Sequence, residues 1–233
     1  MDFWKLLILG VIAAGLILIL WTPPDLPKLP EGVRVEEGTF RLLTKTAVQE
    51  EIFGIYPVDA GFRVVGIRHE KGKVLVEGDL LYAPDWTPLA GTITQRYPQE
   101  ARWLFTFTGD GVVVRKQVGA KEFTETLPVS EQTFPVDSDL LAVWDPLFRA
   151  NVQGEVQLLD VRNATIHKIR IGPKEGVELD VLGRPMPAER HPVTWDDSVL
   201  WIFRQGDLVI GLKSPKYEAF LLEILPQGIR EVP

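Results

Sequence analysis

The feature that most constrains this chain is an apolar run near its start, at residues 3–21. Residues 6–20 are all Leu, Ile, Val, Ala or Gly, and Trp4 and Trp21 bracket the run. A helix over this stretch would place the two indoles about 25 Å apart, close to the thickness of a bilayer's hydrocarbon core, with a Trp at each interface. The run therefore predicts a transmembrane anchor over residues 1–21, in contact with the membrane bilayer.

The same run could in principle be a cleaved signal peptide or a buried core helix. A signal peptide would end in small residues at a cleavage site, whereas this run leads directly into the Trp-Thr-Pro-Pro of residues 21–24. A core helix that is apolar all round would need a domain on every side of it. Flanking charges are few: Lys5, offset by Asp2, precedes the uninterrupted apolar residues 6–20, and Lys28 and Arg34 follow. A short leader before a long domain fits a signal anchor, so we expect a single-pass protein of the cell inner (cytoplasmic) membrane whose C-terminal domain is extracytoplasmic.

The amino-acid composition limits which partners the chain can bind and which reactions its side chains can support. The formal net charge of −7 repels phosphate backbones, so we expect no nucleic acid partner. The absence of Cys excludes disulfides, thiol catalysis and a lipid-modified cysteine. Two Asn and two Met beside 18 Pro are typical of a thermophile protein, in which thermolabile residues are sparse.

A proline-rich linker follows the anchor, over residues 22–37. Pro23, Pro24, Pro27 and Pro30 favour an extended polyproline conformation, which would hold the next domain up to about 34 Å from the membrane. The segment could be a stalk of set reach or an ordinary linker.

From residue 38 onward the hydrophobic period is two, which predicts strands. The expected strands, each bounded by Gly, Pro or Asp, are residues 39–42, 49–56, 61–68, 73–82, 102–108, 112–118, 123–127, 166–171, 177–181, 199–204, 208–212 and 217–225. This pattern predicts an all-β extracytoplasmic domain over residues 38–227, a large antiparallel curved sheet or half-barrel, with a tail at 228–233. Whether the sheet closes, and whether residues 166–181 extend it or form a second lobe, stays open.

One segment breaks the period of two. Leu140, Leu141, Trp144, Leu147 and Phe148 share one helical face, which predicts a short helix. Ser138 or Asp139 would be its N-cap, and Pro146 would break it after a turn or two.

No catalytic or metal-binding signature is present, so we expect no enzyme activity, no cofactor and no metal. His69, His167 and His191 lie far apart, without ligand spacing, and there is no nucleophile elbow or phosphate loop. The acidic pairs, Asp137/Asp139, Asp196/Asp197 and Glu50/Glu51, could serve a glycosidase only if two carboxylates converged across a cleft. A turn or a helix cap accounts for them more simply.

An aromatic stripe is the strongest candidate for a binding site. Trp103, Phe105 and Phe107 lie on one face of one predicted strand, and Trp144 and Phe148 of the predicted helix could cover them. Such a stripe either forms a core or lines an apolar groove, as a curled but unclosed sheet can.

The order of elements carries two resemblances. Strands, then the Phe-Pro-Val-Asp of residues 134–137 before a short apolar helix, then further strands with a Trp-bearing pair at 200–207 and a closing strand, resemble an uncharacterised family of bacterial envelope β domains. This plan is similar to the half-barrel lipoprotein carriers of the periplasm, whose concave face holds acyl chains. It is also similar to the single-span β-jellyroll subunits of lipopolysaccharide export.

Three functions follow as hypotheses. In the first, the β domain binds a lipid or other apolar ligand in a groove lined by the five aromatic residues, without a covalent step. In the second, it is a structural or assembly subunit of an envelope complex, whose exposed sheet edges pair with other chains. The third is a carbohydrate-active enzyme, which would need two carboxylates from among Asp137, Asp196 and Asp197 to converge in a cleft.

Overall fold

The computed structural model describes residues 27–44, 47–129, 132–137, 139–181, 184–195, 198–214 and 217–224. The predicted span with Trp4 and Trp21, the first part of the linker, the pair Asp196/Asp197 and the predicted tail lie outside these residues. Within them, no helix has the length and apolar character that a bilayer crossing requires.

Sixteen strands and one short helical segment make up the described chain. They are β1 (Glu36–Thr44), β2 (Val48–Val58), β3 (Gly61–Glu70), β4 (Lys73–Tyr82), β5 (Pro88–Gln95), β6 (Ala101–Thr108), β7 (Gly111–Val118), β8 (Lys121–Leu127), β9 (Thr133–Val136), the 3₁₀ helix η1 (Ala142–Trp144), α2 (Asp145–Arg149), β10 (Gly154–Asp160), β11 (Thr165–Ile171), β12 (Glu175–Val181), β13 (Arg184–Trp195), β14 (Ser198–Gln205), β15 (Leu208–Lys213) and β16 (Tyr217–Ile224).

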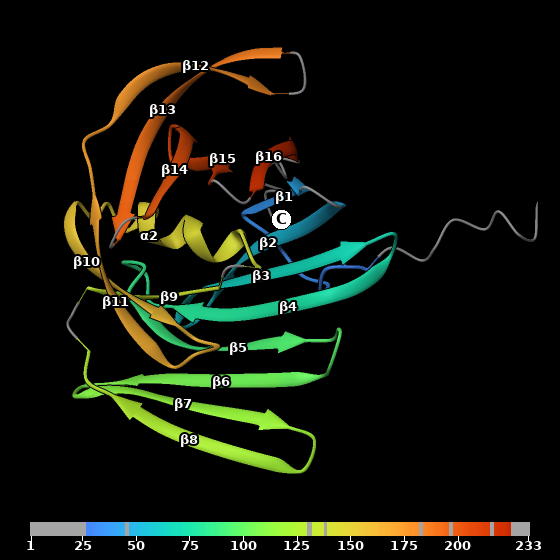
Figure 1. The fold of residues 1–233 in the computed structure, drawn as a ribbon, viewed down its shortest axis with the longest axis vertical. Coiled ribbons are helices and arrows are strands. Elements are labelled where there is room, and N and C mark those ends of the chain that lie inside the picture. The colour runs from blue at the N-terminus through green and yellow to red at the C-terminus, as the bar shows by residue number, and fades with distance from the viewer. Residues whose placement is uncertain are drawn as a thin grey trace, which may run out of the picture.

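All the strands belong to one curved, open sheet (Figure 1). Its order is β8-β7-β6-β5-β4-β3-β2-β1-β16-β15-β14-β13-β11-β10-β9, and β12 pairs beside β13. The predicted all-β class with one short helix is therefore confirmed. One neighbour pair departs from the antiparallel prediction, because β9 runs parallel to β10.

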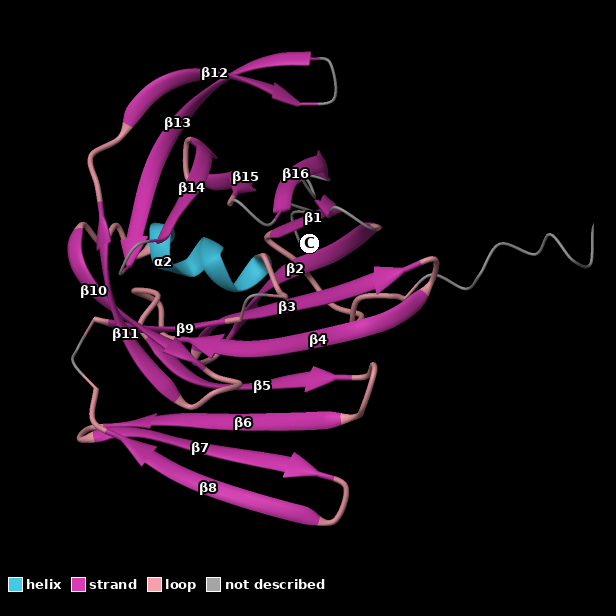
Figure 2. Ribbon diagram, in the orientation of Figure 1, coloured by secondary structure: helices cyan, strands magenta, loops and turns pink. Residues whose placement is uncertain are grey.

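The core lies on the concave side of the sheet, around the helical segment (Figure 2). Alternation produces this face: in β6, for example, Ala101, Trp103 and Phe105 are buried while Arg102 and Thr106 are exposed. The β9–β10 end of the sheet curls back over β5 and β6, where Trp103 Nε1 donates to the carbonyl of Arg162 at 3.1 Å. Strands β7 and β8 project beyond this overlap, which leaves β8 as a free edge (Figure 1).

The helical segment differs from its prediction at Pro146. We expected this proline to break the helix, but it stands in the first turn of α2, where its missing N–H has no intrahelical partner to lose. The helix therefore begins as η1 and continues into α2 through the proline. Asp139 does not cap it, because Leu141 is the N-cap of η1 and makes no side-chain cap bond. The other predicted cap, Ser138, lies outside the described residues.

Strands β5, β9, β10 and β13 have no counterpart among the predicted ranges. β13 is rich in proline, which normally argues against an internal strand. Pro185 and Pro187 pair with β12 on one side of β13. On the other side they have no partner in β14, because the pairing of β13 with β14 starts only at Glu189. Pro192 lies in the gap between the β12 and β11 pairings. Pro185 and Pro187 therefore have a neighbouring strand on one side only. Pro192 has β14 on one side and, on the other, only Gly172 just after β11, whose N–H donates to its carbonyl at 2.8 Å.

The segment at residues 166–181 extends the main sheet. β11 and β12 do not fold back on each other; both run along β13, one after the other. A projecting arm of β12 and the first half of β13 results, at the top of Figure 1.

Candidate functional site

The five aromatic residues of the predicted groove lie in the core. Trp103, Phe105, Trp144 and Phe148 are buried, and Phe107 is half-buried against the same cluster. Phe105 and Phe107 contact each other edge to face, with ring centroids 6.1 Å apart. The structure thus brings strand and helix aromatics onto one concave face, as the pattern predicts, and places packed side chains around them. That these residues bind a ligand remains a prediction.

Two glycines form a notch in which the helical segment begins. Gly66 of β3 and Gly78 of β4 stand opposite each other, in a row that continues through Ile93 to Trp103. A Cβ on Gly78 would lie 2.7 Å from Leu140 Cδ1, and a Cβ on Gly66 would lie 3.2 Å from the Cβ of Ala142. The absence of side chains at these two positions lets the chain approach the sheet closely.

Glu51 holds the start of η1 from the opposite element. Its fully buried carboxylate accepts hydrogen bonds from the backbone N–H of Leu141, at 2.8 and 3.0 Å, and from that of Ala142, at 2.7 Å. Burial raises the pKa of Glu51 to about 7, against the lowering effect of the two N–H groups and of Arg68. This contact performs the role that the sequence assigned to Ser138 or Asp139.

An ion-pair network lies beside this contact. The guanidinium of Arg162 bonds both oxygens of the buried Asp137 and reaches Asp139 at 2.8 Å. Asp137 also accepts the N–H of Asp139 at 2.7 Å, a local turn. Burial raises the pKa of Asp137, and Arg162 opposes that rise. The candidate pair Asp137/Asp139 therefore has a structural role, tying the chain before the helix to the loop after β10.

The far end of the helix is fixed by a second network. The buried carboxylate of Asp145 accepts bonds from Arg149 and from the backbone N–H of Val209, and Arg149 also bonds Glu36 of β1 at 2.7 Å. Burial raises the pKa of both Asp145 and Glu36, and Arg149 opposes both shifts. The fully buried hydroxyl of Tyr82, which has a raised pKa through burial and Asp145, has no hydrogen-bond partner among the described residues.

Trp86 borders this second network in a strained conformation. Its φ of 68° is rare for a bulky residue, and such strain tends to gather at functional positions. Its ring stacks on Phe62, with centroids 4.3 Å apart, and the guanidinium of Arg149 lies 5.2 Å from its ring centroid.

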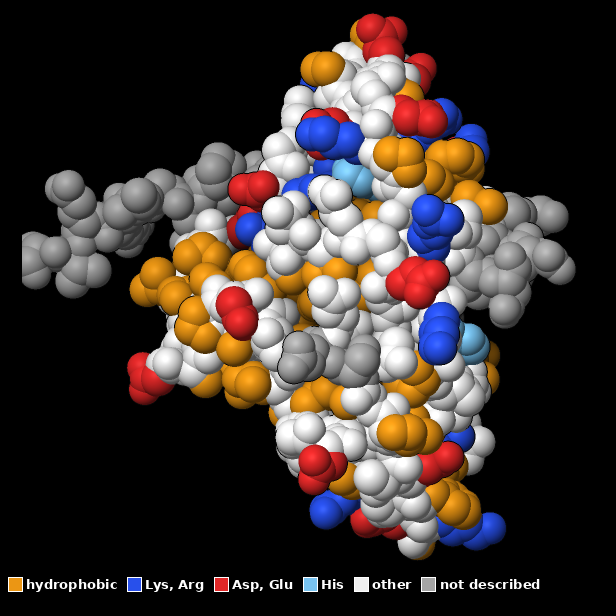
Figure 3. Space-filling model, turned by 90° about the vertical axis from the view of Figure 1, so that its left-hand side faces the viewer, with side chains coloured by type: hydrophobic (Ala, Val, Ile, Leu, Met, Phe, Trp, Pro, Cys, Tyr) orange, Lys and Arg blue, Asp and Glu red, His pale blue; other side chains and the backbone are white. Residues whose placement is uncertain are grey.

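The face drawn in the space-filling view of Figure 3 carries acidic and basic side chains scattered among hydrophobic ones. On the convex side, a pocket of about 500 Å³ lies over β3 to β6. Its charges are largely paired: Arg63 bonds both oxygens of Asp79, at 2.8 and 2.6 Å, and Arg96 pairs with Glu77 and Glu100.

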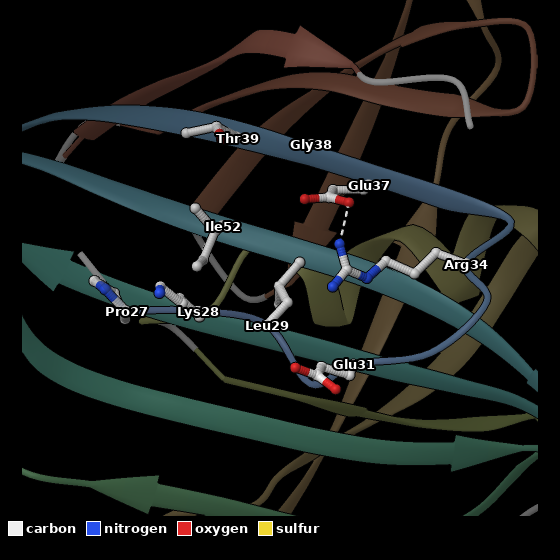
Figure 4. Close-up of a pocket in the computed structure, with 9 residues that line it drawn as sticks. All are labelled: Pro27, Lys28, Leu29, Glu31, Arg34, Glu37, Gly38, Thr39 and Ile52. Atoms are coloured by element: carbon white, nitrogen blue, oxygen red, sulfur yellow. Dashed lines mark hydrogen bonds and ion pairs between the residues drawn. The ribbon is translucent and has the colours of Figure 1, made fainter. Parts of the chain in front are cut away.

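Another pocket lies on the convex face, beside the end of the linker (Figure 4). Residues 27–34, which we call the strap, run across β2 and β3 there. Leu29 is buried against Tyr56, Val65 and Ile67, and the Tyr56 hydroxyl donates to the carbonyl of Pro30 at 2.9 Å. The pocket between strap, β1 and β2 has a volume of about 390 Å³. The described part of the predicted linker thus packs on the domain.

No group of acidic and His residues in the described chain has the arrangement of a metal site. Glu50 and Glu51 point to opposite faces of β2, since Glu50 pairs with Arg41 on the outside. His69 and His191 are buried and His167 is exposed on β11. Burial lowers the pKa of His69 and of His191.

The sequence reasoning missed the residues that hold the helix: Glu51, Gly66, Gly78, Arg149 and Arg162. One signal was available for the first of these. A Glu on the strand face that also carries Phe53 and Ile55 requires a buried partner. The sequence does not reveal which partner.

Comparisons with known proteins give one structural neighbour. No family model and no curated protein matches the sequence. The chain is similar in structure to the β-barrel-like protein of domain of unknown function DUF1849 from Brucella abortus, with 12% sequence identity and a TM-score of 0.49, over 84% of this chain and 100% of that one. The resemblances to lipoprotein carriers and to lipopolysaccharide-export subunits remain expectations, and the function proposed below rests on the geometry of the chain itself.

Proposed function

We propose that the chain is a non-catalytic protein of the cell envelope, held at the inner membrane by residues 3–21, whose extracytoplasmic β domain is an interaction module of a membrane protein complex. The observation that supports this most directly is the free edge of the sheet. Six of the seven residues of β8 are exposed, and Phe123 has 58% of its surface in contact with solvent. Unpaired edges are templates for a strand from another chain.

The filled concave face also favours this function. The aromatic residues and the helix pack into one core, fixed at both ends by buried carboxylates. A scaffold of this kind presents its edges and its convex face at constant geometry, which is what an assembly partner requires.

The strap would keep this module near the bilayer. Because residues 27–34 are docked on the convex face, only residues 22–26 separate it from the end of the predicted span. Six extended steps cover at most about 20 Å. The convex face of β2 and β3 would then lie closer to the membrane than the full linker length suggests.

A proline at position 124 tests the edge. Thr124 lies in the middle of β8, on the set of residues whose N–H groups face away from β7, so Thr124→Pro removes one edge donor without breaking the β7 ladder. The full-length protein would be extracted from its native membrane in detergent and analysed by native mass spectrometry. We expect protein adducts on the wild type and on Thr124→Ala, and their loss from Thr124→Pro. Adducts that persist on Thr124→Pro, or a bare monomer mass for the wild type, would exclude this use of the edge.

A second candidate function is the binding of a lipid or other apolar ligand on the concave face, with the helix as its lid. The observation in its favour is that the helix is held partly by titratable groups. In addition, Tyr82 Oη next to the helix and Trp144 Nε1 on it are buried without hydrogen-bond partners among the described residues. Displacing the helix would expose Trp103, Phe105 and Phe148.

A disulfide lock tests the lid. The chain has no Cys, and the Cβ of Ala142 lies 3.2 Å from a Cβ built on Gly66, a few tenths of an ångström below the usual Cβ separation of a disulfide, so a small shift would allow the bond. A retained lipid mass on reduced Gly66→Cys/Ala142→Cys that is absent after oxidation would support the lid. Equal lipid retention in both states, or none in the wild type, would count against it.

A further inference from the structure

The free edge of β8 has a defined hydrogen-bonding phase. β7 and β8 are joined by the two residues Gly119 and Ala120, and Gly119 has a φ of 58°, as in the II′ turns of two-residue hairpins. In such a hairpin Val118 and Lys121 form the first hydrogen-bonded pair, so the odd-numbered residues of β8 bond to β7. Residues 122, 124 and 126 therefore turn their backbone N–H and C=O groups toward the free edge.

The odd-numbered side chains of β8 form a charged and aromatic pattern. Lys121, Phe123 and Glu125 follow one another on the concave face, and Phe123 stands opposite Lys116 of β7. Phe123 is the most exposed aromatic ring among the large hydrophobic residues of the described chain. An acid and a base thus stand at equal distances on either side of an exposed ring.

We propose that β8 pairs with β8 of a second copy of this chain, antiparallel about a two-fold axis at Phe123. In this register the two Phe123 rings face each other, and Lys121 of each copy faces Glu125 of the other. The central pair is of the non-hydrogen-bonded kind, in which side chains lie closest, while Glu122 and Thr124 exchange backbone bonds across the edge. The two sheets become one continuous sheet.

Charge selects this register over its neighbours. A two-fold axis perpendicular to the sheet allows only registers centred on a residue, and centres at Glu122 or at Glu125 would place two glutamates face to face. A centre at Thr124 would place Lys121 opposite Leu127 and lose both ion pairs. Opposite charges across a strand pair stabilise it and like charges destabilise it, so the register at Phe123 is favoured.

The row of side chains on the concave face supports the same arrangement. Ile93, Trp103, Lys116 and Phe123 stand opposite one another in β5 to β8, and the Lys116 ammonium lies 5.4 Å from the Trp103 ring centroid. Pairing at Phe123 continues this row into the second copy and covers the projecting end of the sheet. This inference rests on the proposed function, because both use the free edge of β8, and it names a second copy of the chain as the partner.

Cross-linking of single cysteines tests the pairing, since the natural chain has none. Full-length Phe123→Cys would be oxidised mildly in its native membrane, beside Asp110→Cys, a control at the exposed β6–β7 turn. We expect a covalent dimer for Phe123→Cys only. In the Phe123→Cys background, Lys121→Glu should lower cross-linking by about tenfold, because two ion pairs become two repulsions, and adding Glu125→Lys should restore it.

The outcomes separate this inference from the proposed function. Equal cross-linking at positions 123 and 110, or no response to Lys121→Glu, would overturn the two-fold pairing. If other protein adducts were then still lost from Thr124→Pro, the edge would bind a different chain and the proposed function would stand. If neither cross-link nor adduct appeared, both would fall. Restoration by the charge-exchanged pair would show that the loss in Lys121→Glu depends on the charges at positions 121 and 125 and not on the substitution at 121 as such.

Discussion

The carboxylate of Glu51 on β2 accepts the backbone N–H of Leu141, 90 residues later in the chain, at 2.8 Å. Both groups are buried. The bond supplies an acceptor at the start of η1, where the first N–H groups of a helix lack intrahelical partners and where a negative charge is favoured. One side chain of the sheet thereby determines where the helical segment begins.

The first prediction concerns pH. The pKa of Glu51 is about 7 in the folded chain, against 4.5 for an exposed glutamate, so between these values the folded state holds a proton that the unfolded state releases. The free energy of unfolding should fall as pH rises across this window, by up to about 3 kcal/mol, and the contribution should be constant above it. Glu51→Gln should remove this part of the slope, measured by urea unfolding at about pH 5 and about pH 7.5.

Glu50→Gln is the matched control, because Glu50 neighbours Glu51 but points to the convex face. Asp137, Asp145 and Glu36 also have raised pKa values, so the wild type keeps a slope from them. The difference between wild type and Glu51→Gln isolates the one residue. An unchanged slope in Glu51→Gln would show that Glu51 does not titrate in this range.

The second prediction concerns the glycine notch. A Cβ at position 78 would approach Leu140 Cδ1 to 2.7 Å, so Gly78→Ala should lower the free energy of unfolding by about 1–3 kcal/mol. Leu140→Ala alone should cost about 2–5 kcal/mol through a cavity, and the double variant should cost less than the sum because the clash disappears. Gly109→Ala, where an added Cβ meets no atom within 4 Å, should change stability by less than about 0.5 kcal/mol. Strict additivity would show that the two residues do not touch.

The strands were predictable because their signal is local. Residues 61–68, 73–82 and 102–108 alternate in the sequence and form β3, β4 and β6 in the structure. β13 was missed because its prolines argue against an internal strand, and they are tolerated because each lies where β13 has a paired strand on only one side. That arrangement depends on where β11, β12 and β14 end, which no pattern within β13 reveals.

The site was predictable only in outline, for the same reason. The apolar face of the helix and the aromatic stripe of β6 are local patterns, and the structure brings them onto one concave face. The local capping signal at Asp139 was misleading, since the acceptor at the helix start is Glu51, on another strand. Contacts between residues so far apart in the chain depend on sheet curvature, and curvature has no short-range signature in this sequence.

The third prediction concerns Arg162. Arg162→Met leaves the buried carboxylate of Asp137 without its charged partner, so we expect a loss of about 3–5 kcal/mol in the free energy of unfolding. Arg162→Met/Asp137→Leu should recover part of that loss, because no charge then remains buried. Arg96→Met is the control: its pairs with Glu77 and Glu100 are exposed, so it should cost at most about 1 kcal/mol. Equal losses for Arg162→Met and Arg96→Met would show that burial of the ion pair does not determine how much its loss destabilises the fold.

The fourth prediction concerns the strap, the segment at residues 27–34. The Tyr56 hydroxyl donates to the Pro30 carbonyl at 2.9 Å and accepts from Arg34 Nε at 3.1 Å, so Tyr56→Phe removes both bonds while the ring still packs against Leu29. A net loss of about 1 kcal/mol in docking should raise the rate of tryptic cleavage after Lys28 about fivefold. Cleavage requires the strap to leave the sheet, and its rate therefore reports the docked fraction.

Val33→Ala is the control for this prediction and should leave the cleavage rate unchanged, because Val33 is largely exposed in the same segment. If Tyr56→Phe and wild type were cleaved equally fast, the two hydroxyl bonds would contribute nothing to docking of the strap.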